Sequence, residues 1–337
     1  MKKINLAING FGRIGRAAAK IITNSFPNIN IVAVNDLTDP ETLAHLMQYD
    51  SCYGRYDKKI SATKDSIIVD GHKIPVLAIK DPSLLPWQKL KVDVVLECTG
   101  RFTNKEDLGL HLKAGAKKVI LSAPAKKGGV KTIVIGVNEN KILSSDHLIS
   151  CASCTTNCLA PATKVIKDKF GIKKALMSTV HAYTADQNLV DGPHKDLRRA
   201  RGAAINIIPT TTGAALAVTE TIPSLKGKFD GMAIRVPVPV GSLCDVTYLL
   251  GKKTTIEAVN AEFIKVSRGK LKGILEASDE ELVSSDIVGN PHSSIVDLKS
   301  TALVGGDLLK VVAWYDNEWG YSNRLVELVD YLKKFVK

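Results

Sequence analysis

Gly10-Phe11-Gly12-Arg13-Ile14-Gly15 stands between an apolar segment, Lys3 to Asn9, and a segment whose apolar residues have helical spacing, Arg13 to Thr23. The first segment is typical of a strand and the second of a helix. A glycine-rich turn between them permits a tight bend and lets the backbone approach a pyrophosphate, which binds the N–H groups at the helix N-terminus. The stretch therefore predicts a doubly wound dinucleotide-binding domain.

Asp36 ends the second predicted strand, Ile31 to Asp36, about 20 residues after the glycines, which is the usual spacing for the carboxylate that binds the ribose. This carboxylate can accept hydrogen bonds from both ribose hydroxyls and would repel a 2′-phosphate. It therefore favours NAD over NADP. The alternative is a local role in the turn Asn35-Asp36-Leu37-Thr38, where Asp and Asn are common.

The rest of the chain separates into two parts with different patterns. Up to about residue 152, short β-branched runs alternate with helical patterns, which is typical of a mostly parallel sheet covered by helices. Beyond it, a long polar stretch over 185–209 interrupts helices and strands that do not alternate regularly. We predict an α/β protein with a Rossmann domain over 1–152, joined by a C-terminal helix at 319–337, and an α+β catalytic domain over 153–318 with a mixed or antiparallel sheet.

The predicted elements are bounded by apolar periodicity and by glycine or proline. In the first part they are strands at 92–97, 118–121, 132–135 and 148–151 and a helix at 105–114. In the second part they are helices at 155–170, 256–267 and 322–335 and strands at 174–183, 232–236, 244–250, 294–297 and 308–315.

Length and composition agree with two soluble domains, because 337 residues with 45% hydrophobic side chains can supply two cores. No apolar run is long enough to cross a bilayer. The start, Met1-Lys2-Lys3, resembles a signal peptide, but the apolar stretch after it is too short for one. We therefore expect a cytoplasmic protein without a membrane partner.

The formal charge of +12 favours anionic partners, which include nucleic acid, a membrane surface and phosphorylated metabolites. Charge alone does not choose among them. Aromatic residues make up only 5% of the chain, so the stacking platforms that bind single strands are sparse. Nucleic-acid binding stays open on this evidence.

Cys154 lies within the segment Ser150 to Cys158, where a predicted strand gives way to a predicted helix. A thiol at a helix N-terminus is easily ionised, so Cys154 is a candidate nucleophile. The alternative is a buried cysteine that acts as a small hydrophobe. Cys151 and Cys154 also have the spacing of a redox pair, and that hypothesis stays open. We expect no metal site, because no second cysteine pair or histidine pair completes one.

A thiol nucleophile needs a base, and His181 is the best placed of the seven histidines. It ends a predicted strand and precedes Ala182-Tyr183-Thr184. Strand ends in such folds carry many catalytic groups, although a lone histidine is more often a structural hydrogen-bonding residue.

Five segments together resemble the family of phosphorylating glyceraldehyde-3-phosphate dehydrogenases, and the resemblance covers nearly the whole chain. They are Ile8-Asn9-Gly10-Phe11-Gly12-Arg13-Ile14-Gly15-Arg16, Ala152-Ser153-Cys154-Thr155-Thr156-Asn157-Cys158-Leu159-Ala160-Pro161, His181-Ala182-Tyr183-Thr184, Asp196-Leu197-Arg198-Arg199-Ala200-Arg201 and Trp314-Tyr315-Asp316-Asn317-Glu318-Trp319-Gly320-Tyr321-Ser322.

The resemblance implies that Cys154 is the nucleophile and His181 the base, in the glycolytic and gluconeogenic reaction that converts glyceraldehyde 3-phosphate to 1,3-bisphosphoglycerate. It also implies a homotetramer, with the 185–209 stretch lining the cofactor site and subunit contacts. The implied NAD contacts, taken with the glycines, are Gly10, Gly12, Arg13, Ile14, Gly15, Asp36, Lys80, Ser122 and Asn317. The implied contacts to the substrate phosphate and to inorganic phosphate are Ser153, Thr155, Thr184, Arg199, Thr212, Gly213 and Arg235.

The chain departs from the family at a few positions. Cys151 stands where the family usually has Asn, and Lys80 stands where many members have Arg beside the adenine. Two other functions stay open: an erythrose-4-phosphate dehydrogenase, which shares the fold and the cysteine, and a nucleotide- or RNA-binding protein without catalysis.

Overall fold

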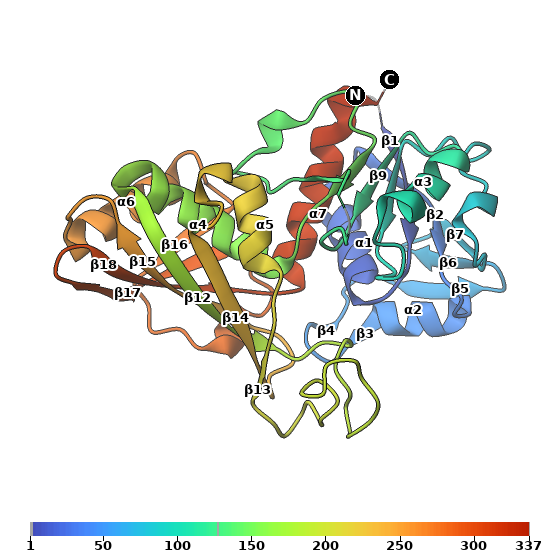
Figure 1. Cartoon of the computed structure of the whole chain (residues 1–337). Coiled ribbons are helices and arrows are strands. Elements are labelled where there is room, and N and C mark those ends of the chain that lie inside the picture. Colours follow the sequence, from blue (N-terminus) through green and yellow to red (C-terminus); the bar gives the residue numbers. More distant parts are fainter. Residues whose placement is uncertain (1–2, 127, 337) are drawn as a thin grey trace. The chain divides into compact units, whose positions relative to one another are not determined.

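The computed structural model describes residues 3–126 and 128–336. Met1, Lys2, Lys127 and Lys337 fall within the predicted domain ranges and lie outside the described residues. The chain forms two compact units, one of Met1–Ile133, Asn140–Ala152 and Ser322–Lys337 and the other of Val134–Glu139 and Ser153–Tyr321 (Figure 1). The short segment Val134–Glu139 thus belongs to the second unit, although it lies inside the first predicted range.

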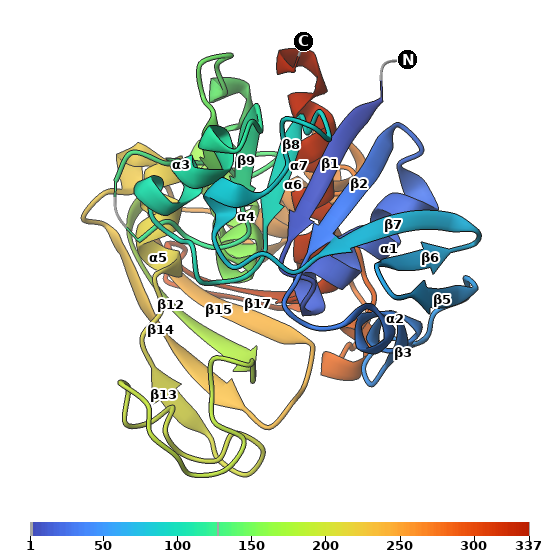
Figure 2. The same cartoon turned by 90° about the vertical axis from the view of Figure 1, so that its right-hand side faces the viewer.

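The first unit contains a nine-stranded sheet in the order β10-β11-β9-β8-β1-β2-β7-β6-β5. The seven strands from β10 to β7 run parallel, and the β6 and β5 pairings are antiparallel. Figure 2 shows β9, β8, β1, β2 and β7 side by side. The strands are β1 (Ile4–Asn9), β2 (Ile29–Asn35), β5 (Ile60–Thr63), β6 (Ser66–Val69), β7 (His72–Leu77), β8 (Val94–Glu97), β9 (Lys118–Leu121), β10 (Lys131–Thr132) and β11 (Leu148–Ser150).

Helices connect or follow these strands, as a doubly wound sheet requires. They are α1 (Arg13–Ser25), α2 (Pro40–Gln48), α3 (Lys105–Lys113) and α7 (Trp319–Leu332), with short 3-10 turns at η1 (Pro82–Leu84), η2 (Glu139–Lys141) and η5 (Lys333–Phe335). A separate ribbon pairs β3 (Tyr49–Asp50) with β4 (Gly54–Arg55).

The central strands of this sheet are buried on both faces, which explains why they read as nearly continuous apolar runs. Ala7, Val95 and Val119 come from three neighbouring strands and pack in one core cluster with Trp87. Since parallel strands end at the same edge, the loops after β1, β2 and β8 meet there.

The second unit contains a mixed seven-stranded sheet in the order β13-β14-β12-β15-β18-β17-β16. Its β12–β14 and β16–β17 pairs are parallel and the other pairs are antiparallel, so the prediction of a mixed sheet is confirmed. The strands are β12 (Ile172–Ala182), β13 (Ile208–Thr210), β14 (Phe229–Val236), β15 (Ser242–Leu250), β16 (Leu275–Ser278), β17 (Ser294–Val304) and β18 (Leu308–Tyr315).

Helices α4 (Cys154–Phe170), α5 (Ala214–Thr221) and α6 (Ile256–Arg268) cover one face of this sheet, and 3-10 turns follow at η3 (Pro223–Leu225) and η4 (Ser284–Ile287) (Figure 1). Every second residue of β15 is buried, as expected for a strand with one covered face. The opposite face exposes Leu176 and Leu308.

One predicted strand is shorter than the sequence indicated. The run 132–135 was predicted as a strand, but β10 ends at Thr132. The N–H of Val134 donates to the side chain of Asn138 at 2.8 Å, so the chain has already turned away. Helix α2 and the β5–β7 strands were not predicted. The turn between β6 and β7 has positive φ at both Asp70 and Gly71, which is the backbone of a tight hairpin.

Candidate functional site

The glycines before α1 are required by close approach of the backbone. Gly10 has a φ of +90°, and a Cβ on it would lie 2.6 Å from the backbone nitrogen of Thr99. A Cβ on Gly15 would lie 2.3 Å from the carbonyl oxygen of Gly10. Gly12 is the N-cap of α1 and has no side chain to cap it, so the helix N-terminus remains open to an anion.

A cavity of about 640 Å³ lies next to this turn. Asp36 lines it, and its carboxylate accepts the N–H groups of Phe11 at 2.8 Å and Thr38 at 3.0 Å. Both bonds fix a carboxylate beside the glycine turn, where the ribose of a dinucleotide is expected. The lining residues are Asn9, Gly10, Gly12, Asn35, Asp36, Leu37, Ile79, Lys80, Cys98, Thr99, Arg101 and Phe102.

The cavity thus brings together Gly10, Gly12, Asp36 and Lys80 among the predicted NAD contacts. The other NAD contacts predicted in the first unit do not line this cavity. The guanidinium of Arg13 binds Asp50 at 3.1 Å, and Ser122 follows β9, where its N–H donates to the carbonyl of Glu97 at 2.9 Å. Ile14 is half-buried on α1 beside the buried Gly15.

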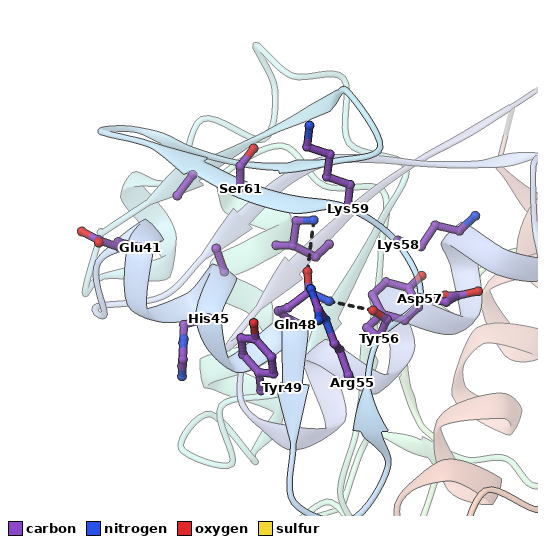
Figure 3. Close-up of a pocket in the computed structure, with 13 residues that line it drawn as sticks. Glu41, His45, Gln48, Tyr49, Arg55, Tyr56, Asp57, Lys58, Lys59 and Ser61 are labelled. Atoms are coloured by element: carbon purple, nitrogen blue, oxygen red, sulfur yellow. Dashed lines mark hydrogen bonds between the residues drawn. The ribbon is translucent and has the colours of Figure 1, made fainter.

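The same unit has a second cavity, of about 670 Å³, between α2 and the β5 strand (Figure 3). The side-chain amide of Gln48 spans its floor, donating to the carbonyl of Tyr56 at 2.6 Å and accepting the N–H of Ile60 at 3.3 Å. Arg55 stacks over Tyr49 with 5.6 Å between the guanidinium carbon and the ring centre. None of the predicted site residues lines it.

In the second unit, Cys154 is the first residue of α4. Ser153 is the N-cap, and its hydroxyl accepts the N–H of Thr156 at 3.1 Å. A hydroxyl residue at this position stabilises the start of a helix. The thiol therefore lies at the N-terminus of a helix, as predicted, and the structure adds that Ser153 caps this helix.

His181 lies near the end of β12, and its Nε2 is 3.4 Å from the Sγ of Cys154. Its Nδ1 is 2.6 Å from the carbonyl oxygen of Ala182. A carbonyl only accepts, so Nδ1 carries the proton and Nε2 presents its lone pair to the sulfur. The imidazole is oriented to take a proton from the thiol.

Burial favours the neutral form of both groups. It raises the pKa of the Cys154 thiol to about 11, although the nearby Arg235 cation opposes this rise. It lowers the pKa of His181 to about 3, and Arg235 adds to that shift. The positive charge of Arg235 and the helix N-terminus favour the thiolate, whereas loss of hydration favours the neutral thiol, so the two effects act in opposite directions.

Tyr315 packs against His181 and was not a predicted site residue. Its hydroxyl is 2.9 Å from the hydroxyls of both Thr155 and Thr179. Its ring meets the ring of His181 edge to face, with 5.9 Å between the centres. Tyr315 belongs to one of the five segments that carry the resemblance, but no local pattern indicates its contact with a histidine far away in the sequence.

Arg235, on β14, lies next to Cys154 and His181. Its Nη1 donates to the carbonyl of Ala182 at 3.0 Å and to the hydroxyl of Thr184 at 3.2 Å. Its Nε is buried and has no hydrogen-bond partner among the described residues. A buried guanidinium N–H without a partner is suited to bind an anion. The structure therefore brings Thr184 and Arg235 together.

Arg199 and Thr212, two of the other predicted phosphate contacts, form hydrogen bonds with neighbouring residues of the chain. Arg199 donates from Nε to the hydroxyl of Thr210 and from Nη2 to the carbonyl of Thr211, each at 3.0 Å, and it pairs with Asp186. Thr212 accepts the N–H of Ala214 at 3.2 Å, and Gly213 is the N-cap of α5. None of these bonds involves the thiol of Cys154.

Asn317 follows β18 and is buried. Its Oδ1 accepts the N–H of Gly241 at 3.2 Å and the hydroxyl of Ser242 at 2.9 Å. Both contacts identify the oxygen end of the amide and fix its orientation, as an amide that positions a carboxamide ligand would need.

Two family models match the chain. The glyceraldehyde 3-phosphate dehydrogenase NAD binding domain matches residues 4–105, and the C-terminal domain of the same enzyme matches residues 153–317. Glyceraldehyde-3-phosphate dehydrogenase of Geobacillus stearothermophilus is 53% identical over 330 residues, which is 98% of each chain. The enzyme of Mycolicibacterium smegmatis is 55% identical over 333 residues, which is 97% of each chain.

The chain belongs to the glyceraldehyde-3-phosphate dehydrogenase family. Membership of this family makes it an NAD-dependent oxidoreductase, so the predictions of enzyme class and cofactor are confirmed. The open glycine turn and the cavity beside Asp36 fit such a cofactor.

The described part of the chain has no helix that is both long and apolar enough to cross a membrane. No group of three or more metal-binding side chains occurs among residues 3–126 and 128–336. All six cysteines are free thiols.

Proposed function

We propose that this glyceraldehyde-3-phosphate dehydrogenase family member oxidises D-glyceraldehyde 3-phosphate to 1,3-bisphosphoglycerate through a thioester on Cys154. The observation that carries the proposal is the orientation of His181, whose Nε2 faces the sulfur at 3.4 Å while Nδ1 is held by Ala182. A nucleophile with a base oriented by a third group is the arrangement that covalent catalysis needs.

The first step forms the carbon–sulfur bond. His181 accepts the thiol proton at Nε2 as the sulfur adds to the aldehyde carbon, and it returns this proton to the aldehyde oxygen, giving a hemithioacetal. NAD, when bound, supplies the hydride acceptor for the oxidation. As that oxidation proceeds, Nε2 accepts the hydroxyl proton, and a thioester on Cys154 remains.

The second step releases the product. Inorganic phosphate attacks the thioester carbon, the carbon–sulfur bond breaks, and the sulfur recovers its proton from His181. An acyl phosphate leaves, so the free energy of oxidation is retained in the product instead of being lost to water. We place one phosphate group against Arg235 and Thr184, since a guanidinium can bind phosphate through two N–H groups.

The remaining anion contacts are proposed from the resemblance and from position. Ser153, Thr155, Thr212 and Gly213 lie at the N-termini of α4 and α5, where backbone N–H groups favour anions. Arg199 pairs with Asp186 and orders the loop beside Thr210. We propose that its role is to hold this loop and to contribute positive charge to the site.

For the cofactor, we propose that Asp36 binds the adenosine ribose and that Lys80 lies beside the adenine. Gly10, Gly12, Arg13, Ile14 and Gly15 form or flank the pyrophosphate turn. Ser122 follows the neighbouring strand β9, and the fixed amide of Asn317 orients the nicotinamide.

We further propose that the enzyme is a homotetramer. The 185–209 loop exposes a set of large apolar side chains, each more than 70% exposed: Leu189, Val190, Leu197, Ile205 and Ile207. Monomeric proteins rarely expose so many in one segment, so another subunit is expected to cover them.

NAD reduction by the purified protein with glyceraldehyde 3-phosphate tests the reaction, with and without inorganic phosphate. Strong phosphate dependence is expected. Turnover without phosphate would contradict the acyl phosphate product. Faster turnover of erythrose 4-phosphate would favour the alternative substrate, which the names of the relatives do not favour.

A further inference from the structure

A network of buried, hydrogen-bonded polar side chains crosses the first unit and has no part in the proposed reaction steps. It consists of Trp87, His111, Glu97, Asn9 and Asn35, none of which is more than 6% exposed. A buried polar group lowers the stability of the fold unless each donor meets an acceptor, so the direction of every hydrogen bond in this network matters.

The direction is set at the tryptophan end. The indole N–H of Trp87 donates to Nδ1 of His111 at 3.0 Å, and an indole nitrogen can only donate. Nδ1 of His111 is therefore the acceptor, and Nε2 carries the ring proton. Nε2 lies 3.1 Å from Oε2 of Glu97, to which it donates.

Four donors converge on the carboxylate of Glu97. Besides His111, the side-chain amide of Asn9 donates to Oε2 at 2.5 Å. The N–H of Thr99 donates to Oε1 at 2.8 Å, and the Thr99 hydroxyl also binds Oε1. Both oxygens are surrounded by donors, so neither can be replaced by an NH2 group without placing two donors together.

The carboxylate fixes the orientation of two amides in turn. Because Nδ2 of Asn9 faces Glu97, its Oδ1 faces Asn35, whose Nδ2 donates to it at 2.7 Å. Nδ2 of Asn35 also donates to the carbonyl of Ile79 at 2.9 Å, and its Oδ1 accepts the N–H of Ile79 at 2.9 Å. A flipped Asn35 would oppose both backbone groups of Ile79.

The two ends of this network differ in their access to the cavity beside Asp36. Asn9, Asn35, Thr99, Ile79 and the adjoining Lys80 line it, whereas the fully buried Glu97 and His111 do not. The network runs across the carboxyl ends of β8, β1 and β2, which lie side by side (Figure 2).

We infer that Glu97, oriented by His111, is a positioning residue for the adenosine half of NAD. It sets the amide of Asn9, which sets the amide of Asn35, which holds the Ile79–Lys80 segment as a wall of the cavity. The inference rests on the proposed placement of adenosine beside Asp36.

Glu97→Gln is the direct test, because it keeps the shape and replaces one acceptor by a donor. An NH2 group in the place of Oε1 opposes the N–H of Thr99. An NH2 group in the place of Oε2 opposes the donors of His111 and Asn9, and a flipped Asn9 passes the mismatch through Asn35 to Ile79. We expect the dissociation constants of NAD and of ADP-ribose, measured by calorimetry, to rise about tenfold, the effect of one unsatisfied buried donor. The change should appear in the KM for NAD to a greater extent than in kcat.

Asn35→Ala is the second variant, since it removes the bonds to Ile79 and leaves Glu97 and its donors in place. Asn35 borders the cavity, so water can fill the space and the variant should fold. Asn30→Ala is the matched control, because Asn30 lies on the same strand outside the cavity and its amide makes one long bond, 3.4 Å, to Asn5. We expect Asn35→Ala to weaken ADP-ribose binding and Asn30→Ala to leave it unchanged.

The double variant Glu97→Gln/Asn35→Ala separates a relay from two independent structural effects. If Glu97 acts through Asn35, the double variant should bind ADP-ribose about as weakly as Asn35→Ala alone. Multiplicative losses, or wild-type affinity in a folded Glu97→Gln protein, would overturn the inference. Failure of Asp36→Ala to weaken ADP-ribose binding would instead refute the placement of adenosine on which the inference rests.

Discussion

The imidazole of His181 presents Nε2 to the sulfur of Cys154 across 3.4 Å. The two residues come from different elements, the end of β12 and the start of α4, and both are held independently of any ligand. The hydrogen bond from Nδ1 to Ala182 decides which nitrogen is protonated, so the lone pair of Nε2 faces the sulfur.

Replacing Cys154 by serine should abolish turnover, because a hydroxyl is a much weaker nucleophile than a thiol beside the same base. The proposed cofactor contacts do not include Cys154, so NAD should bind as in the wild type. Mass spectrometry of the protein after mixing with aldehyde and NAD in the absence of phosphate should find the acylated chain only in the wild type. Turnover by Cys154→Ser would refute the thioester.

Replacing His181 by asparagine should lower kcat roughly 10²- to 10⁴-fold, which is the usual contribution of a general base. Stopped-flow measurement of NADH formation in the first turnover isolates this step from product release. His147→Asn provides a matched control, because His147 is exposed and its imidazole contacts the backbone carbonyl of Lys117, at 2.9 Å. An unchanged first-turnover rate in His181→Asn would assign the base role to another group.

Replacing Arg235 by leucine should raise the pKa of the Cys154 thiol further. The positive charge of Arg235 stabilises the thiolate and opposes the effect of burial, so its loss disfavours ionisation. The fraction of thiolate at neutral pH then falls, and alkylation by iodoacetamide becomes slower, with its pH profile displaced to higher pH. The KM for phosphate should rise in the same variant. Arg268→Leu, at the exposed end of α6, should change neither quantity.

Replacing Asp36 by alanine should weaken NAD binding and improve the use of NADP. In the proposed placement the carboxylate accepts hydrogen bonds from the ribose and repels a 2′-phosphate, and hydrogen bonds to a charged group are worth about 1.5–3 kcal/mol. The measurement is kcat/KM for each cofactor. If the ratio of the two values did not change, Asp36 would be only the turn residue that binds Phe11 and Thr38.

Local patterns predicted the parts of this molecule that depend on local sequence. The glycine turn, the strand before it and the helix that starts at Cys154 follow from spacing, and the residues of β9 and β18 were predicted with the observed bounds. Asp36 could be placed because its distance from the glycines along the chain is set by one strand–helix–strand unit.

Contacts between distant segments were not accessible in this way. No spacing relates Tyr315 to His181, or Glu97 to Asn35, because each pair is joined only by sheet register and packing. The raised pKa of Cys154 likewise depends on burial by the surrounding elements, whereas the sequence showed only its position at a helix start. Strands β5 and β6 were missed because each has only four residues, and β7 was missed because it begins with two polar residues and contains Pro75.

The exposed apolar loop gives a test of the tetramer that does not depend on activity. Leu197 and Ile205 are more than 80% exposed in the single chain, and burial of such a side chain stabilises an interface by about 1.5–3 kcal/mol. The double variant Leu197→Glu/Ile205→Glu should therefore raise the dissociation constant of the assembly at least about tenfold, seen as a lower mass in sedimentation at low protein concentration. Leu84→Glu changes a leucine that is 71% exposed on η1, outside this loop, and should leave the mass unchanged. A tetramer of unaltered stability in the loop variant would show that these side chains are not in the interface, since two buried carboxylates per subunit could not be accommodated there without loss.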